Sequence, residues 1–276
     1  MLKKIIFDIS PELATSFSVQ QLLHSFPDSL EALFCSPLTV PAYSPENCLV
    51  ITDSSSGIRN AKSQAFPCIG YAPPGTPENL SGAYALFEDF ASVDATYFYR
   101  THAHAIGYPA TILTTKRLLV REFSQEDFPA LFTMCTEPST ASFMKETLSD
   151  FNTEQEKHAA YIRNVYPLFD LALWAICDKS SGRLIGRAGF SLPKGNDDTF
   201  RLGYLIDLSH RKRGYAKECI PALLHYAKEQ GYSIVSAEIK PENIASRRTI
   251  ATCGFPFDCK TNNTTGVITY IIRLTL

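Results

Sequence analysis

The spacing of apolar positions changes from strand-like to helical in the second half of the chain, and this change predicts the order of its elements. Residues 203–207 have the pattern of a strand, and a polar loop at residues 211–216 follows. Beyond the loop, apolar side chains recur at helical spacing, which predicts a helix of about 15 residues that ends at Gly231. Its apolar positions are Cys219, Leu223, Leu224 and Ala227.

The same order of elements then repeats. Residues 232–239 alternate as a strand does, and residues 243–248 open a second helix that we expect to end at residues 253–255. Pro221 lies inside the first helix, where we expect it to kink the axis without altering the preceding loop.

The loop at residues 211–216 has the composition of an anion-binding helix start. The first backbone N–H groups of a helix have no partner within it, and the helix dipole places partial positive charge there. Gly214 permits close approach of a phosphate, and Arg211, Lys212 and Arg213 add positive charge. We therefore expect a cofactor that carries a pyrophosphate.

Six motifs resemble, in order, those of the GNAT superfamily of acyl-CoA-dependent N-acyltransferases, in particular its RimJ/RimL-like branch. They lie within residues 112–276. The resemblance implies acetyl-CoA as cofactor and a mixed, largely antiparallel sheet, flanked by helices and split where the cofactor enters. The motifs are 115–121 with Asp127, 184–186, Gly203-Tyr204, 211–216, Asn243-x-x-Ser246 and Gly254-Phe255.

The resemblance also implies the cofactor-binding residues. The strand at Tyr204, Leu205 and Ile206 would pair with the pantetheine arm and polarise the acetyl carbonyl through backbone N–H groups. The side chains of Leu205 and Ile206 also fit an ordinary core strand. The pyrophosphate would lie against Arg211, Lys212, Arg213, Gly214, Tyr215 and Ala216.

The resemblance also implies that two residues at the start of the second helix act near the thiol of the cofactor. Asn243 would bond the pantetheine, and Ser246 would protonate the leaving thiolate. Both residues also fit an ordinary helix start, in which an Asn caps and a Ser has no catalytic role.

Acetyl transfer also needs a base, because the attacking amine must be neutral. Glu238 and Asp207 are the positional candidates, although either also fits a solvated charge at a strand end. Trp174 fits the core of a hairpin better than the wall of a substrate site.

The first half of the chain has a pattern of its own. Residues 45–58 have the pattern of an apolar strand that leads into a Ser/Gly turn and a helix start. This segment is similar to the fourth motif of the haloacid dehalogenase (HAD) phosphohydrolases, and residues 4–8 resemble the first HAD strand, with Asp8 in the place of its nucleophile. The residues that match the fourth motif are Asp53, Ser54, Gly57, Ile58 and Ala61.

Several groups that the HAD reaction requires are replaced in this chain. Ser10 stands where the family has its acid/base Asp, Pro11 replaces a Gly, and Thr52 replaces the acidic residue before Asp53. Residues 11–45 contain no clear match to the Lys-bearing motif. Because phosphoryl transfer through an aspartyl phosphate needs a nucleophile, a proton donor and carboxylates for Mg²⁺, we expect this domain to be non-catalytic.

Charge differs between the two halves. Residues 1–110 hold 5 Lys and Arg against 10 Asp and Glu, and residues 111–276 hold 21 against 18. Neither half is basic enough to predict a nucleic-acid partner. No apolar run is long enough for a membrane span or, near the N-terminus, for a signal peptide, so a cytoplasmic protein with mostly buried, reduced thiols is expected. The Cys and His residues form no metal-like cluster.

The predicted fold is α/β with two domains. Residues 1–110 would form a truncated HAD-like, Rossmannoid parallel unit, and residues 111–276 a GNAT fold. The predicted function is transfer of the acetyl group of acetyl-CoA to a primary amine, on a protein N-terminus or a small molecule. Two alternatives stay open: a phosphatase that uses Asp8 and Asp53 beside a CoA-sensing second domain, and a non-catalytic adaptor. The acceptor amine and the oligomeric state are open as well.

Overall fold

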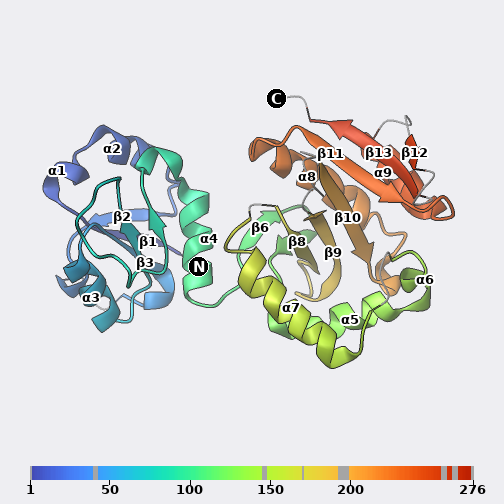
Figure 1. Cartoon of the computed structure of the whole chain (residues 1–276), viewed down its shortest axis with the longest axis horizontal. Helices are drawn as coiled ribbons and strands as arrows, with labels where there is room; N and C mark the ends of the chain where they lie inside the picture. The colour runs from blue at the N-terminus through green and yellow to red at the C-terminus, as the bar shows by residue number, and fades with distance from the viewer. Residues whose placement is uncertain are drawn as a thin grey trace. The chain divides into compact units, whose positions relative to one another are not determined.

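The computed structural model divides into two compact units, Met1–Ala110 and Thr111–Leu276, which are described separately (Figure 1). The residues that it describes are 2–39, 43–144, 148–169, 171–191, 199–255, 260–262 and 267–274.

The first unit contains a five-stranded parallel sheet in the order β2-β1-β3-β4-β5. The parallel order agrees with the predicted Rossmannoid architecture. The strands are β1 (Lys4–Asp8), β2 (Glu31–Phe34), β3 (Cys48–Thr52), β4 (Cys68–Tyr71) and β5 (Leu86–Phe87). The helices are α1 (Pro11–Ala14), α2 (Phe17–His24), α3 (Ser55–Ser63) and α4 (Ala95–Ala105), with short 3₁₀ turns at Pro37–Thr39, Pro45–Asn47 and Phe90–Ser92.

This sheet is covered on both faces, as its continuous apolar strands require. β3 is buried at every position. Alternate residues of the central strands belong to different clusters: Phe7 and Ile51 pack with α2 and α4, whereas Ile6 and Val50 pack with α3. The result is a three-layer arrangement of helix, sheet and helix.

The second unit contains a sheet of eight described strands in the order β12-β13-β11-β10-β9-β8-β7-β6. Every described pair is antiparallel except β10 with β11, so the predicted mixed, largely antiparallel sheet is confirmed. The strands are β6 (Thr111–Thr114), β7 (Leu118–Arg121), β8 (Leu173–Asp178), β9 (Leu184–Ser191), β10 (Phe200–Ile206), β11 (Ile234–Ile239), β12 (Lys260–Asn262) and β13 (Val267–Arg273).

Helices flank this sheet, and the predicted helix after the polar loop is present with 15 residues. Gly231 follows its last turn at φ +82°, as expected for a left-handed stop. The helices are α5 (Phe128–Thr136), α6 (Pro138–Ala141), α7 (Phe151–Val165), α8 (Tyr215–Glu229) and α9 (Ile244–Thr252), and 3₁₀ turns occur at Gln125–Asp127 and Leu208–His210. Pro221 lies inside α8 and does not end it.

The strand predicted over residues 232–239 begins two residues later, at Ile234. The N–H of Tyr232 donates to the carbonyl of Ala227 at 3.0 Å, so this residue closes the end of α8. Its ring packs edge-on against Phe200, with centroids 4.4 Å apart. Tyr232 is therefore apolar because it packs at the end of α8. Its place in the alternating pattern made it resemble the first residues of the strand.

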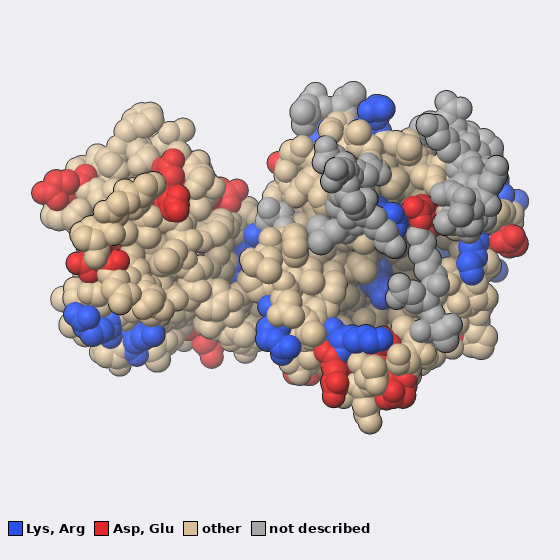
Figure 2. Space-filling model, in the orientation of Figure 1, with Lys and Arg blue, Asp and Glu red and all other residues tan. Residues whose placement is uncertain are grey.

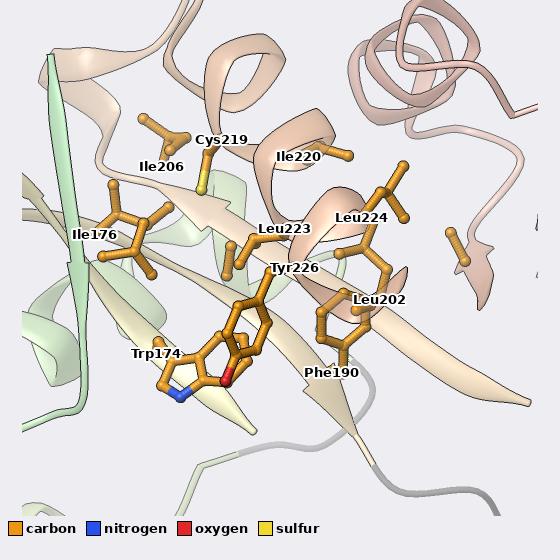
Figure 3. Close-up of a cluster of buried hydrophobic side chains, with 14 of the residues drawn as sticks. Trp174, Ile176, Phe190, Leu202, Ile206, Cys219, Ile220, Leu223, Leu224 and Tyr226 are labelled. Carbon is orange, nitrogen blue, oxygen red and sulfur yellow. The ribbon is translucent and has the colours of Figure 1, made fainter. Parts of the chain in front are cut away.

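The core of the second unit lies between the sheet and α8 (Figure 3). Trp174 on β8 is 1% exposed and packs edge-on against Phe190 and Tyr226, which confirms its prediction as a core residue. Leu202 and Ile206 of β10 point to the same side, toward α8. Because side chains alternate along a strand, the residues between them at odd-numbered positions point to the opposite face.

An ion pair fixes the start of α5 to the end of β7. Arg121 donates to both carboxylate oxygens of Asp127, at 2.6 and 2.8 Å. Burial raises the pKa of Asp127, but the hydrogen bonds from Arg121 and Ser124 outweigh burial, and the pKa is lowered. Asp127 thus remains a charged partner that orients the residues leading into α5.

Seven described cysteines are free thiols, and six of them are buried. Cys259 lies outside the described residues. Among the helices that the structure describes, none is both long and apolar enough to cross a membrane.

Candidate functional site

The second sheet is split between its two parallel strands. β10 and β11 pair at Phe200 with Val235 and at Arg201 with Ser236, and their described register ends there. In contrast, β10 pairs with β9 as far as Ile206. The edge of β10 beyond Arg201 is therefore open toward β11, as the two ribbons in Figure 1 show.

The backbone groups along this open edge follow from strand geometry. In an antiparallel pair, successive residues direct their N–H and C=O groups alternately toward the partner and away from it. The N–H of Asp207 donates to Ile185 at 2.8 Å, so residues of odd number on β10 face β9. Tyr204 and Ile206 therefore direct their backbone groups into the split, whereas Leu205 directs its own toward β9.

The polar loop after β10 leads into a helix start without a side-chain cap. Gly214 occupies the N-cap position of α8 at φ +81°, a left-handed conformation that favours glycine. Lys212, Arg213 and Gly214 are exposed. Ala216 lies in the first turn of α8, whose N–H groups make no side-chain cap bond. This arrangement suits a bound anion.

A salt bridge between Arg117 and Glu218 supports the loop at residues 211–216. Arg117 donates to Glu218 of α8, with its Nε 2.6 Å from Oε2, and its backbone N–H donates to Oε1 at 2.8 Å. Its guanidinium also donates to the carbonyl of Arg213 at 3.0 Å and lies 4.4 Å from the ring centre of Tyr215. Tyr215 is 8% exposed, and its side chain packs in the core of the second unit.

The sequence did not predict the salt bridge between Arg117 and Glu218. Arg117 belongs to the motif at residues 115–121, but nothing in its spacing links it to Glu218, 101 residues later. Burial raises the pKa of Glu218, and hydrogen bonds from Thr115 and Arg117 outweigh burial and lower it. The carboxylate is therefore charged and holds both Arg117 and the loop in place.

Arg211 contacts a part of the molecule that the sequence did not indicate. Its Nε donates to the carbonyl of Ile206 at 3.0 Å, and its other nitrogens donate to the hydroxyls of Ser139 and Thr140 at 2.7 and 2.5 Å. Glu137 lies 3.6 Å away. The guanidinium thus joins the end of β10 to α6, and Lys212 and Arg213 are the loop's exposed basic residues.

A second basic side chain holds the same segment. Lys240, which follows β11, donates to the carbonyl of Ser142 at 2.8 Å. The segment 137–142 is consequently tied to the ends of both strands that border the split. Residues 145–147, which follow this segment in the chain, lie outside the described part.

Asn243 caps α9, in agreement with its interpretation as an ordinary helix start. Its Oδ1 accepts from the N–H of Ser246 at 3.0 Å. The hydroxyl of Tyr204 donates to the carbonyl of Ser246 at 3.3 Å, so the start of α9 lies against β10. Burial raises the pKa of Tyr204, while hydrogen bonds to Ser246 and Thr249 lower it in part.

The two candidate bases both have partners. Glu238 forms an ion pair with Arg201 across the strands, with Oε1 and Nε 3.0 Å apart. Asp207 accepts from the backbone N–H of Ser209 at 3.1 Å and lies 2.9 Å from Nδ1 of His210. Burial raises the pKa of Asp207, but the bonds from Ser209 and His210 outweigh burial and lower it, so Asp207 is a weak base that organises the turn.

In the first unit, Asp8 ends β1 and Asp53 follows the neighbouring strand β3. Burial and the charge of Asp53 both raise the pKa of Asp8. Ser10 stands where the HAD family has its acid/base Asp. In the structure it caps α1, and its backbone N–H donates to Asp53 at 3.1 Å. Within the described residues, no group of three or more His, Cys, Asp or Glu side chains is placed to hold a metal ion.

Residues 117–256, just over half of the chain, match the family described as the acetyltransferase (GNAT) domain. The chain therefore belongs to the GNAT acetyltransferases and is a GNAT-family N-acetyltransferase. The matched segment contains the split strands, the loop before α8 and the start of α9. The resemblance of the first unit to HAD hydrolases stays a prediction.

Two relatives whose names include the term N-acetyltransferase are similar to about half of this chain. The uncharacterized N-acetyltransferase YnaD of Bacillus subtilis (strain 168) is 28% identical over 143 residues, which cover 51% of this chain and 81% of YnaD. The uncharacterized N-acetyltransferase p20 of Bacillus licheniformis is 23% identical over 151 residues, which cover 52% of this chain and 81% of the relative.

Solved structures show the same fold at low sequence identity. RimL, a ribosomal L7/L12 α-N-protein acetyltransferase solved in complex with coenzyme A, has a TM-score of 0.51 at 16% identity, covering 59% of this chain and 98% of RimL. An acetyltransferase from Agrobacterium tumefaciens str. C58 has a TM-score of 0.50 at 21% identity, covering 58% of this chain and 92% of that structure.

Proposed function

We propose that the second unit transfers the acetyl group of acetyl-CoA to a primary amine, on a protein N-terminus or a small molecule, by direct attack. The observation that carries this proposal is the split between β10 and β11, which opens next to the uncapped start of α8. An extended arm fits the open strand edge, and a pyrophosphate fits the helix start.

Acetyl-CoA supplies a thioester carbonyl to the attacking amine. The backbone N–H groups of Tyr204 and Ile206 face the split and are the proposed donors to the charge that develops on the carbonyl oxygen. Removal of one such donor in other enzymes costs roughly 3 kcal/mol of transition-state stabilisation. Lys212, Arg213, Gly214 and Ala216 are the proposed pyrophosphate contacts.

The proton-handling residues lie on opposite faces of the split sheet. Tyr204 points to the face of Leu202 and Ile206, and its hydroxyl contacts Ser246 there. We propose that Ser246 donates a proton to the leaving thiolate. Glu238 shares the other face, since Arg201 pairs with Ser236 in register and Glu238 lies two residues further along the strand.

Glu238 is the proposed base that takes the proton of the amine. Its ion pair with Arg201 competes with the substrate for the carboxylate, so proton transfer requires the pair to open or a water to relay the proton. The new N–C bond forms as the C–S bond breaks. Amine-dependent release of CoA thiol from acetyl-CoA tests the proposal.

The face of the second unit viewed in Figure 2 agrees with a small or peptide acceptor. On the face viewed in Figure 2, basic and acidic side chains of the described residues are interspersed, and no continuous basic area is present among them. A nucleic-acid partner would favour such an area.

We propose that the first unit is non-catalytic. Asp8 and Asp53 are adjacent, but Ser10 is used as a helix cap and Thr52 is fully buried. Among the described residues of the unit, no group of three or more His, Cys, Asp or Glu side chains is placed to hold the Mg²⁺ that an aspartyl-phosphate reaction needs.

The expected result is that the full-length protein shows no Mg²⁺-dependent hydrolysis of a generic aryl phosphate above the rate of the Asp8→Asn variant. The reason is the absence of a proton donor for the leaving group at Ser10. Release of the aryl alcohol with and without Mg²⁺ measures the rate. Turnover that disappears in Asp8→Asn would show that the first unit is a working phosphatase.

A further inference from the structure

A cavity of about 200 Å³ lies between α5, α7 and the sheet, on the face opposite α8. We call it the α5–α7 cavity. Its volume corresponds to roughly six or seven water molecules, which suits one functional group with a short chain and not a whole cofactor. Its walls include Leu131, Cys135, His158, Tyr161, Leu173 and Arg187.

The charged side chains of the cavity, together with His158 and Tyr161, have partners among the described residues, with one exception. The hydroxyl of Tyr161 accepts from the N–H of Leu173 at 2.8 Å, and Nε2 of His158 donates to the carbonyl of Ser124 at 3.0 Å. Lys157 and Glu154 pair at 2.7 Å.

Arg187 is the exception. This half-buried side chain makes no hydrogen bond or ion pair with any residue that the structure describes. A guanidinium offers five N–H donors in a planar fork, and an apolar wall beside it strengthens its attraction for an anion. With Lys157 and Glu154 compensating each other, the α5–α7 cavity carries one net positive charge.

The position of Arg187 links this charge to the proposed acetyl site. Arg187 is the register partner of Leu205, which lies between Tyr204 and Ile206 on β10. Adjacent strands are about 4.8 Å apart. A group bound by Arg187 is thus roughly one to two strand spacings, about 5–10 Å, from the backbone proposed to polarise the acetyl group.

The backbone leaves room between the two places. Gly189 and Gly203 are also register partners, on the same face as Arg187 and Leu205. A β-carbon at Gly203 would meet only Leu173, at 3.8 Å, so no side chain of β10 fills this position. At Gly189 a β-carbon would instead meet the carbonyl oxygen of Ala172 at 2.0 Å, so the sheet surface next to the α5–α7 cavity is low at Gly203 and not at Gly189.

We infer that the α5–α7 cavity binds a carboxylate of the acceptor through Arg187, and that the enzyme prefers amines carrying a carboxylate within about 5–10 Å of the nitrogen. A carboxylate matches the single positive charge, whereas a phosphate, with about −1.5 to −2 charges, would leave negative charge uncompensated between apolar walls. This inference rests on the proposed function.

Two sources of the carboxylate are distinguished by separate substrate pairs. The first pair is 4-aminobutyrate and 4-aminobutyramide. The second pair is two dipeptides with amidated C-termini, alanyl-aspartic acid amide, which keeps its side-chain carboxylate, and alanyl-asparagine amide. We expect the acid of one pair to have a kcat/KM about tenfold higher than its neutral partner. Preference in the first pair indicates a free amino acid, and preference in the second an acidic peptide.

Arg187→Met keeps most of the length of the side chain and removes its charge. We expect it to lower kcat/KM for the preferred acid about tenfold, to leave the neutral partner unchanged and to leave acetyl-CoA affinity unchanged, while Arg187→Lys restores part of the preference. Arg183→Met, at an exposed position just before the same strand, is the matched control and should change nothing. Thermal melting of each variant verifies folding.

A binding measurement makes the inference independent of turnover. Calorimetric titration of the preferred acid into protein saturated with CoA should give heat in the wild type and in Arg183→Met but not in Arg187→Met. If thiol is released equally from acid and neutral acceptors, or if Arg187→Met reduces both equally, the carboxylate subsite is wrong. If no acceptor releases thiol while acid binding still depends on Arg187, the subsite stands and the proposed function fails.

Discussion

Gly214→Val should weaken acetyl-CoA binding at least about tenfold while the protein remains folded. A β-carbon at this position would meet only Nη2 of Arg117, at 3.6 Å, so the protein itself leaves room for it. The added side chain would instead occupy the approach of the pyrophosphate to the start of α8. Calorimetry with acetyl-CoA measures the loss of affinity.

The same helix supplies a matched control for backbone strain. Gly231 follows the other end of α8 at φ +82°, nearly the value of +81° at Gly214, and a β-carbon there would have no neighbour within 4 Å. Both valine variants should lose stability, by about 1–2 kcal/mol each. Equal acetyl-CoA affinities of folded Gly214→Val and Gly231→Val would remove the argument for a pyrophosphate at this loop.

Ser246→Ala should lower kcat about tenfold and leave acetyl-CoA affinity near normal, because the hydroxyl is proposed to act only when the thiolate leaves. The cap of α9 is the side chain of Asn243, which bonds the backbone N–H of Ser246. This bond survives the substitution to alanine, so a loss of kcat would not come from a lost cap. Initial rates with a known acceptor give kcat.

Asn243→Ala is the matched comparison, since it removes the cap and should cost about 1 kcal/mol of unfolding free energy. A fall in melting temperature of Ser246→Ala with unchanged kcat would assign Ser246 a structural role. Only the backbone donors of β10 would then remain in the proposed mechanism.

The sequence predicted the elements around the site because their signals are local. Gly214, Asn243 and Gly231 each mark a helix end through their own backbone or side-chain preference, and the structure places all three at such ends. The mixed sheet was implied by the resemblance of the motifs to the GNAT superfamily, and the structure contains it. The preferences of single residues at helix ends were therefore sufficient to predict where the loop and the helices lie along the chain.

The side-chain partners could not be predicted, because they join segments far apart in the chain. Arg211 was expected to face a pyrophosphate, yet it bonds Ser139 and Thr140, 72 and 71 residues earlier. Arg187 gave no signal in the sequence, because its significance depends on its place in a cavity built from α5 and α7. Such properties arise only when the fold brings distant surfaces together.

Thiol release from acetyl-CoA, measured with and without a panel of primary amines, tests the central claim most directly. We expect thiol release that depends on the amine, saturates with acetyl-CoA, and falls in Gly214→Val when acetyl-CoA is below saturation. Tight binding of acetyl-CoA without amine-dependent release from any member of the panel would contradict catalysis and favour a CoA-sensing role for the second unit.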